Sequence, residues 1–423
     1  MQQKRRLMGG ACLLGLIVAC GVGSSLVEDS IQEGTGNATQ ADGRQVPMFE
    51  VDPLWPKNLP NHWLMGPTIG VDVDSRDHIW VVHRNTPDQF VGRTEIGLVQ
   101  DPPLSECCAP APPVLEFDQA GNLISSWGGP GSETADYVWP VSNHGITIDH
   151  MDNVWIGSNG GPDSHVLKFS RDGGFLMQIG AFGARAAGES DGRPLFKRDS
   201  HASGSFGRVA KIGIDASANE AYFADGYLNR RVAVVDMETG RLKRYWGAYG
   251  NEPDDDVDLG RYIPGSVPAQ QFRGPVHCSE ISVDGLIYVC DRAADRIQIF
   301  QKDGTFVSET IVAPNTLAQG STWDIDFSHD PEQTYLYLAD GQNMKVYILL
   351  RETMEVLTAF GDGGRQPGMF FAVHSIAVDS DGNIYTTETY EGSRVQKFVY
   401  KGMGPIPAGA NGINSQGVLW PTN

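Results

Sequence analysis

The sequence predicts an all-β protein and, more narrowly, a six-bladed β-propeller. The first observation is that the 423 residues show no helical periodicity, whereas alternation of apolar and polar residues with a period of two recurs along the chain. The second is that the 51 glycines indicate many turns, with Asp-Gly, Gly-Asn and Gly-Gly pairs bounding the alternating segments. The third is an internal repeat built around an aromatic residue.

Six segments of the chain carry this aromatic marker. Successive markers are 75, 67, 66, 49 and 48 residues apart. Most are followed by two further strand-like segments, such as "RVAVVD" and "LKRYWG" after the third marker, so a unit holds four strands. Four strands repeated six times describe a six-bladed propeller. The markers are Trp80, Trp155, Tyr222, Tyr288, Tyr337 and Tyr385.

The chain is expected to begin with a signal peptide of the lipoprotein type, residues 1–19. "MQQKRR" is a basic stretch, a short apolar run follows, and "IVAC" resembles a bacterial lipobox in which Cys20 is acylated after cleavage. The alternative is a plain secretion signal in which Cys20 has no role. The mature protein is therefore expected to be exported, either as a lipoprotein on the outer face of a bacterial membrane or in the periplasm, or as a secreted protein.

The remaining boundaries follow from composition and repeat. Residues 20–47 are predicted to be a flexible tether, 48–402 the propeller and 403–423 a C-terminal tail. Insertions at 86–113, 184–205 and 251–270 account for the uneven marker spacing.

The last repeat ends after its third strand near Tyr400. We therefore expect the segment from Met48 to Trp55 to supply the missing outer strand and close the ring. Closure of this kind removes the exposed edges of an open array of sheets.

The charge of the mature chain restricts its partners. Loss of residues 1–19 moves the formal charge from −20 to −23, because it removes Lys4, Arg5 and Arg6 and no acid. Nucleic acid is not expected as a partner, since phosphate binding needs a basic surface. Contact with a membrane is expected only through a lipid at Cys20.

Export permits disulfides. Cys278 and Cys290 flank a hairpin centred on an Asp-Gly pair, so they can face each other across two strands. Cys107 and Cys108 are adjacent in a proline-rich segment. The pairing of these four cysteines stays open, and free thiols are the alternative.

One position of the repeat carries histidine in alternate units. Counting back eleven residues from the marker gives His144, His277 and His374 in units two, four and six, whereas units one and three give Ile69 and Lys211. The innermost strand of each blade lines the central channel, so the three imidazoles are expected to point at one axial position. Three nitrogens with an open fourth position are the geometry of a catalytic zinc site. For a single histidine, the alternative is a structural hydrogen bond.

Two arginines and a tyrosine also follow the repeat. Arg84 and Arg292 each lie four residues after the marker of their unit, and Tyr227 lies five residues after the marker of unit three. These positions follow the second strand, so they are expected on loops at one face of the propeller. Two guanidinium groups beside a metal suit an anionic substrate, because arginine binds carboxylates through two hydrogen bonds.

Together these residues resemble the peptidyl-α-hydroxyglycine α-amidating lyases (peptidylamidoglycolate lyases), which carry NHL-type repeats. The resemblance covers roughly Thr68 to Phe398. "NHGITIDHMDNVW", "ADGYLNRRVAVV", "VHCSEISVDGLIYVCDRAADRIQIF", "VHSIAVDSDGNIY" and "VVHRN" look like the family's segments for its metal histidines, its tyrosine and its two arginines.

The resemblance implies an enzyme that cleaves a peptidyl-α-hydroxyglycine, or a similar 2-hydroxy-2-amido acid, into an amide and glyoxylate. The substrate would be a small molecule or peptide with a carboxylate. The implied roles are one zinc ion held by three histidines, a tyrosine base and two arginines around the carboxylate. The residues in these roles are His144, His277 and His374, Tyr227, and Arg84 and Arg292.

One departure from the family pattern limits the resemblance. The family's structural calcium would lie near Ile146 and Ser375, but Ser375 stands where the family has an acidic ligand, which argues against calcium here.

Two other functions also remain open: an NHL-repeat propeller that only binds a partner, and a lactonase-like hydrolase. Histidine at the axial position disfavours the hydrolase, because such sites resemble a carboxylate-rich calcium centre.

Overall fold

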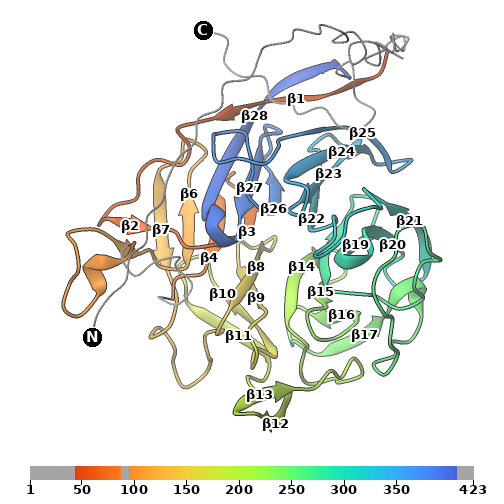
Figure 1. Ribbon diagram of the computed structural model, residues 1–423, viewed down its shortest axis with the longest axis horizontal. Coiled ribbons are helices and arrows are strands. Elements are labelled where there is room, and N and C mark those ends of the chain that lie inside the picture. Colours follow the sequence, from red (N-terminus) through yellow and green to blue (C-terminus); the bar gives the residue numbers. More distant parts are fainter. Residues whose placement is uncertain (1–42, 87–94, 407–423) are drawn as a thin grey trace, which may run out of the picture. The chain divides into compact units, whose positions relative to one another are not determined.

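The computed structural model describes residues 43–86 and 95–406, which contain six four-stranded antiparallel sheets arranged as a propeller (Figure 1). The predicted fold class is confirmed. Blade 1 contains β3 (Thr68–Val73), β4 (Ile79–His83), β6 (Val114–Phe117) and β7 (Leu123–Trp127). Blade 2 contains β8 (Asn143–Ile148), β9 (Val154–Ser158), β10 (His165–Phe169) and β11 (Phe175–Gly180). Blade 3 contains β14 (Val209–Asp215), β15 (Glu220–Asp225), β16 (Arg231–Asp236) and β17 (Leu242–Trp246).

The other three blades repeat this order. Blade 4 contains β18 (Val276–Ile281), β19 (Ile287–Asp291), β20 (Arg296–Phe300) and β21 (Phe306–Ile311). Blade 5 contains β22 (Asp324–Phe327), β23 (Tyr335–Asp340), β24 (Lys345–Leu350) and β25 (Glu355–Phe360). Blade 6 contains β26 (Val373–Val378), β27 (Ile384–Glu388), β28 (Arg394–Pro405) and β1 (Gln45–Asp52).

The N-terminal strand closes the ring, as the sequence predicts. β1 pairs antiparallel with β28 and is the outer strand of blade 6. Both strands extend three residues beyond the predicted limits of the propeller, because residues 45–47 pair with residues 403–405. The edge that blade 6 would otherwise expose is thereby covered.

The innermost strands surround the axis, and each contacts the innermost strand of the next blade, including β26 of blade 6 with β3 of blade 1. The aromatic markers all lie in the second strands and are at most 2% exposed. In blades 1, 2 and 6 the polar edge of the marker also donates a hydrogen bond to the aspartate of the preceding hairpin, as Trp80 does to Asp74. The marker therefore recurs because it packs between blades and is fixed by the hairpin.

The connections carry short elements of their own. The first predicted insertion contains the turn η2 (Gly97–Val99) and β5 (Ala109–Pro110), which pairs with β2 (Trp63–Leu64). The second contains the hairpin of β12 (Ala186–Ser190) and β13 (Arg193–Phe196). Three more short 3-10 turns are η3 (Ala248–Gly250), η4 (Arg292–Ala294) and η5 (Tyr390–Gly392).

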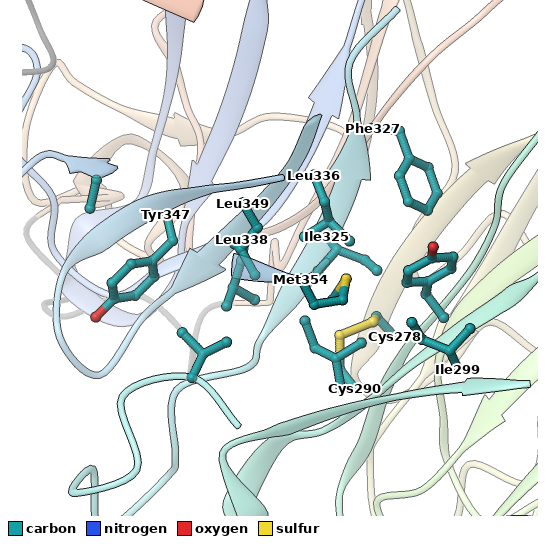
Figure 2. Packing of buried hydrophobic residues seen from close by; sticks show 14 residues of the cluster. Cys278, Cys290, Ile299, Ile325, Phe327, Leu336, Leu338, Tyr347, Leu349 and Met354 are labelled. Carbon is teal, nitrogen blue, oxygen red and sulfur yellow. A yellow bond between two sulfur atoms is a disulfide. The ribbon is translucent and has the colours of Figure 1, made fainter. Parts of the chain in front are cut away.

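The packing between blades 4 and 5 includes a disulfide (Figure 2). Cys278 on β18 lies opposite Cys290 on β19, and the two are bonded, with their Cα atoms 4.9 Å apart. Apolar side chains of blade 5, including Ile325 and Leu336, surround this pair. Cys107 and Cys108 form the second disulfide of the described residues.

Part of the predicted organisation lies outside the described residues. This holds for the signal peptide, Cys20, most of the tether and residues 407–423 of the tail. Within residues 43–86 and 95–406, no helix has both the length and the apolar composition needed to cross a membrane.

Candidate metal centre

The three predicted histidines meet at the axis. His144, His277 and His374 are each the second residue of an innermost strand, on β8, β18 and β26. All three are at most 4% exposed, and their candidate ligand atoms lie within 4.8 Å of one another. The shared repeat position thus brings the three imidazoles together.

A break in strand pairing coincides with each histidine. In β8 the register with the second strand shifts between Asn143 and Ile146, and the corresponding shifts in β18 and β26 span His277 and His374. An extra residue of this kind bends a strand and re-aims its side chain. The same shift spans Ile69 in blade 1 and Lys211 in blade 3, so it belongs to the repeat and is not particular to the histidines.

The outer nitrogen of every imidazole is held by the backbone of the next blade. The Nδ1 atoms of His144, His277 and His374 lie 2.8, 2.5 and 2.8 Å from the carbonyl oxygens of Ala210, Trp323 and Ile69. A carbonyl only accepts, so each Nδ1 carries the proton and donates it. This leaves Nε2 unprotonated, with a lone pair that can bind a metal ion, which is the arrangement that metal-binding histidines use.

Burial also keeps the imidazoles neutral. It lowers the pKa of His144 to about 3, helped by the charge of Arg84, and it lowers the pKa of His277 and of His374 well below the ordinary value. Neutral imidazole is the form that binds a metal ion. The three side chains therefore fit one zinc-like ion in protonation, orientation and spacing.

Tyr227 lies against the histidines. Its hydroxyl oxygen is 2.8 Å from Nε2 of His144 and 3.0 Å from Nε2 of His277. Arg292, the first residue of η4, donates from Nη1 to the same oxygen at 3.2 Å. The phenol group is thus placed between the Nε2 atoms of two histidines and the guanidinium group of Arg292.

The two predicted arginines are charges without an acidic partner. Neither Arg84 nor Arg292 forms an ion pair with a carboxylate of the described residues. Arg84 donates to Oδ1 of Asn159 at 2.9 Å, and Arg292 donates to Oε1 of Gln319 at 3.2 Å. The Nε atom of each guanidinium is buried without a hydrogen-bond partner in the protein. Arg292 is buried and Arg84 is half-buried, and cations in this state suit a bound anion.

Sequence reasoning missed three residues at this site. Asn159 lies four residues after its marker, which is the repeat position of the two arginines, and Tyr390 lies five after its marker, which is the position of Tyr227. The repeat could therefore have revealed both. Gln319 lies in the connection from β21 to β22, where no repeat position applies, and it accepts a hydrogen bond from the Tyr390 hydroxyl at 3.0 Å.

The residues below the histidines do not fit a calcium ion. Ser375 is hydrogen-bonded through Oγ to Oδ2 of Asp324 at 2.6 Å. The other oxygen of Asp324 accepts from the ammonium group of Lys211 at 2.8 Å. A positive side chain thus lies where the resemblance implies a cation, which agrees with the expectation that Ser375 argues against calcium.

Comparison with known proteins supports the fold and leaves the activity open. The NHL repeat model matches residues 373–398, which contain His374. Mouse (Mus musculus) NHL repeat-containing protein 3 is 25% identical over 317 residues, covering 74% of this chain and 70% of that protein. Peptidyl-alpha-hydroxyglycine alpha-amidating lyase 1 of Drosophila melanogaster is 25% identical over 296 residues. That alignment covers 65% of this chain and 48% of the relative, about half its length.

Two solved lyase structures align with most of the chain at low similarity. A streptogramin B lyase structure aligns with a TM-score of 0.45 and 12% identity, covering 85% of this chain and 98% of that one. A virginiamycin B lyase from Staphylococcus aureus aligns with a TM-score of 0.44 and 12% identity, covering 86% and 90%. At these TM-scores and identities, neither structure carries an inference about this chain.

Proposed function

We propose that the protein is a zinc-dependent lyase that cleaves a peptidyl-α-hydroxyglycine, or a similar 2-hydroxy-2-amido acid, into an amide and glyoxylate. The observation that carries the proposal is the meeting of three neutral imidazoles, one phenol and two arginines without acidic partners. The distant similarity to an amidating lyase agrees with it. A partner-binding propeller would need none of these groups at its axis.

The reaction needs a proton acceptor, a group that binds the carboxylate and a way to stabilise charge. Tyr227 would take the proton of the substrate hydroxyl, after which the carbon–oxygen double bond of glyoxylate forms and the carbon–nitrogen bond breaks. The same residue would return the proton to the departing amide nitrogen, so no water, oxidant or reductant is consumed. Zinc, when bound by the three histidines, would act as a Lewis acid toward the hydroxyl oxygen.

The arginines would orient the substrate. Arg84 and Arg292 come from blades 1 and 4, so a carboxylate between them would be fixed from two sides of the axis. Arg292 also lies 4.6 Å from the ring centroid of Trp323, which keeps its guanidinium in place. Asn159 and Gln319 hold the outer nitrogens of the two guanidinium groups.

The test is release of glyoxylate from synthetic α-hydroxyhippurate by the zinc-loaded protein. We expect benzamide and glyoxylate in equal amounts. Tyr335→Phe is a suitable control, because that hydroxyl binds the carbonyl of Gln45 and is remote from the site. No glyoxylate from this compound or from peptidyl-α-hydroxyglycines, with zinc bound, would contradict the proposal and favour a binding scaffold.

The location of the protein is a separate proposal. We propose that export exposes a mature N-terminus at Cys20, anchored to a membrane by a lipid. The basis is the signal-peptide pattern and the cysteine that ends its apolar run. Mass spectrometry of the mature chain should find acylated Cys20, and an unmodified N-terminus at another residue would contradict this.

A further inference from the structure

The ammonium group of Lys211 lies inside the channel with a complete set of acceptors. Lys211 is on β14, and its Nζ lies 2.7 Å from Oε1 of Glu280 and 2.8 Å from Oδ1 of Asp324. A third contact, at 3.4 Å, reaches the carbonyl oxygen of Ile325. An ammonium has three protons, and each has an oxygen here. Burial alone would lower its pKa, but the charges of Asp324, Glu280 and Asp326 raise the pKa of Lys211 above its ordinary value.

This network lies directly beneath the metal centre. Lys211, Asp324 and Ser375 each follow, by one residue, a member of the histidine layer: Ala210, Trp323 and His374. A cavity of about 10 Å³, enough for about one water molecule, is lined by the three histidines together with Lys211, Asp324 and Ser375. The histidines and the network of Lys211 therefore line the same cavity.

The network also joins four blades. Lys211, Glu280, Asp324 and Ser375 come from β14, β18, β22 and β26, the innermost strands of blades 3 to 6. Oδ2 of Asp324 accepts from the backbone of Ile376 as well. Bridging of several strands through oxygen ligands is what a structural divalent ion does in proteins.

The channel holds more acid than one lysine neutralises. Burial raises the pKa of Glu280 to about 8, of Asp326 to about 7 and of Asp72 to about 6. Each of these shifts is the cost of placing a negative charge among the inner strands. Without Lys211, the same oxygens would form a site with a strong preference for a cation.

We propose that Lys211 is a built-in cation that takes the place of a structural divalent ion beneath the histidines. Its charge is covalently attached, so the inner strands stay joined whatever the calcium concentration outside the cell. The protein should need no calcium to be fully stable. The proposal does not depend on the lyase activity.

The test is to remove the lysine and ask whether calcium replaces it. Purified zinc-loaded wild type and Lys211→Ala are unfolded by heat in resin-treated buffer, with and without millimolar calcium. We expect calcium to leave the wild type unchanged and to raise the unfolding temperature of Lys211→Ala by about 2 °C or more. Calorimetric titration should find one calcium ion in the variant and none in the wild type.

Two further variants make the result specific. Lys168→Ala removes another buried lysine, paired with Asp149 at 3.3 Å on blade 2, and should gain no response to calcium. Adding Asp324→Asn to Lys211→Ala should abolish the response, because it removes an ion ligand. Folding of Lys211→Ala only in the presence of calcium would also support the proposal.

Three outcomes would overturn it. Calcium bound and stabilising in the wild type would show that the lysine does not replace the ion. A folded Lys211→Ala that ignores calcium would show that the oxygens do not form a cation site. If Lys211→Ala stays unfolded with and without calcium while Lys211→Ala with Asp324→Asn folds, the lysine serves only to neutralise Asp324.

Discussion

Even-numbered and odd-numbered blades contribute different groups at the start of their innermost strands. Blades 2, 4 and 6 supply the imidazoles of His144, His277 and His374. Blades 1, 3 and 5 supply backbone carbonyls that accept from these imidazoles. One set would bind the metal and the other holds the ligands in place. The difference teaches how six similar blades produce a site with three ligands. Every second blade supplies an imidazole side chain, and the blades between them supply backbone carbonyls.

The largest expected loss of zinc and activity comes from removing the histidine of an even-numbered blade, which then supplies no metal ligand, like an odd-numbered blade. His144→Ala, His277→Ala or His374→Ala should each release zinc and lower kcat/KM by more than about 100-fold, since even outer partners of metal ligands are worth tenfold to a hundredfold. Zinc content by mass spectrometry and glyoxylate release provide the two measurements. His165→Ala is the control, because His165 is buried in blade 2 but hydrogen-bonds the backbone of Val138. Zinc retained in all three variants would exclude the site.

The next prediction concerns an odd blade that contributes a side chain from a loop. Tyr227 of blade 3 lies 2.8 Å from one metal-facing nitrogen and 3.0 Å from another. Tyr227→Phe removes only the hydroxyl, so zinc content and folding should be unchanged. Turnover should fall by about 100-fold or more, the scale of a lost general base. Full activity in this variant would remove Tyr227 from the mechanism and leave the zinc site intact.

The alternation explains which parts of the site sequence reasoning could find. A histidine is visible in the sequence, so its recurrence in every second unit predicted the ligands. The carbonyl layer is invisible in the sequence, because it is backbone. The residues that carry it, Ile69, Ala210 and Trp323, are apolar and buried like many others in the core, so nothing in their side chains marks the position. The strand bulges at the histidines have no sequence signal of their own either.

The fold, in contrast, could be predicted because its repeating feature is a side chain and is therefore visible in the sequence. Its marker aromatics are buried in equivalent second strands, so packing imposes the same residue class in every blade. The closing strand could be placed because the last repeat lacks an outer strand. Asn159 and Tyr390 were missed, although they occupy the repeat positions at which Arg84, Arg292 and Tyr227 had been predicted to act. Lys211 was noted only because it is not a histidine at the axial position. Its role depends on Glu280 and Asp324, which come from other blades.

A smaller effect on activity is expected for the two arginines, which do not follow the alternation of blades. Arg84 is in blade 1 and Arg292 in blade 4, so both sets of blades supply an arginine. Arg84→Ala and Arg292→Ala should each raise KM for a carboxylate substrate by about tenfold to a hundredfold, the range for a hydrogen bond to a charged group. The increase should be smaller for an analogue without the carboxylate. Equal losses for both substrates would show that the arginines do not bind the carboxylate.

The smallest effect on zinc binding is expected from a side-chain change in an odd-numbered blade, because these blades contribute backbone carbonyls. Ile69 contributes a carbonyl to His374, and its side chain is 1% exposed in the packing between blades. Ile69→Val keeps the backbone and removes one methylene, so the free energy of unfolding should fall by about 1 kcal/mol. Zinc affinity and glyoxylate release should stay within about twofold of wild type, well below the tenfold that marks a disturbed ligand partner. Chemical denaturation and competition with a zinc-binding dye measure the two quantities separately. If Ile69→Val releases zinc while the protein stays folded, the carbonyl depends on the side chain that carries it, and the division between side-chain blades and backbone blades fails.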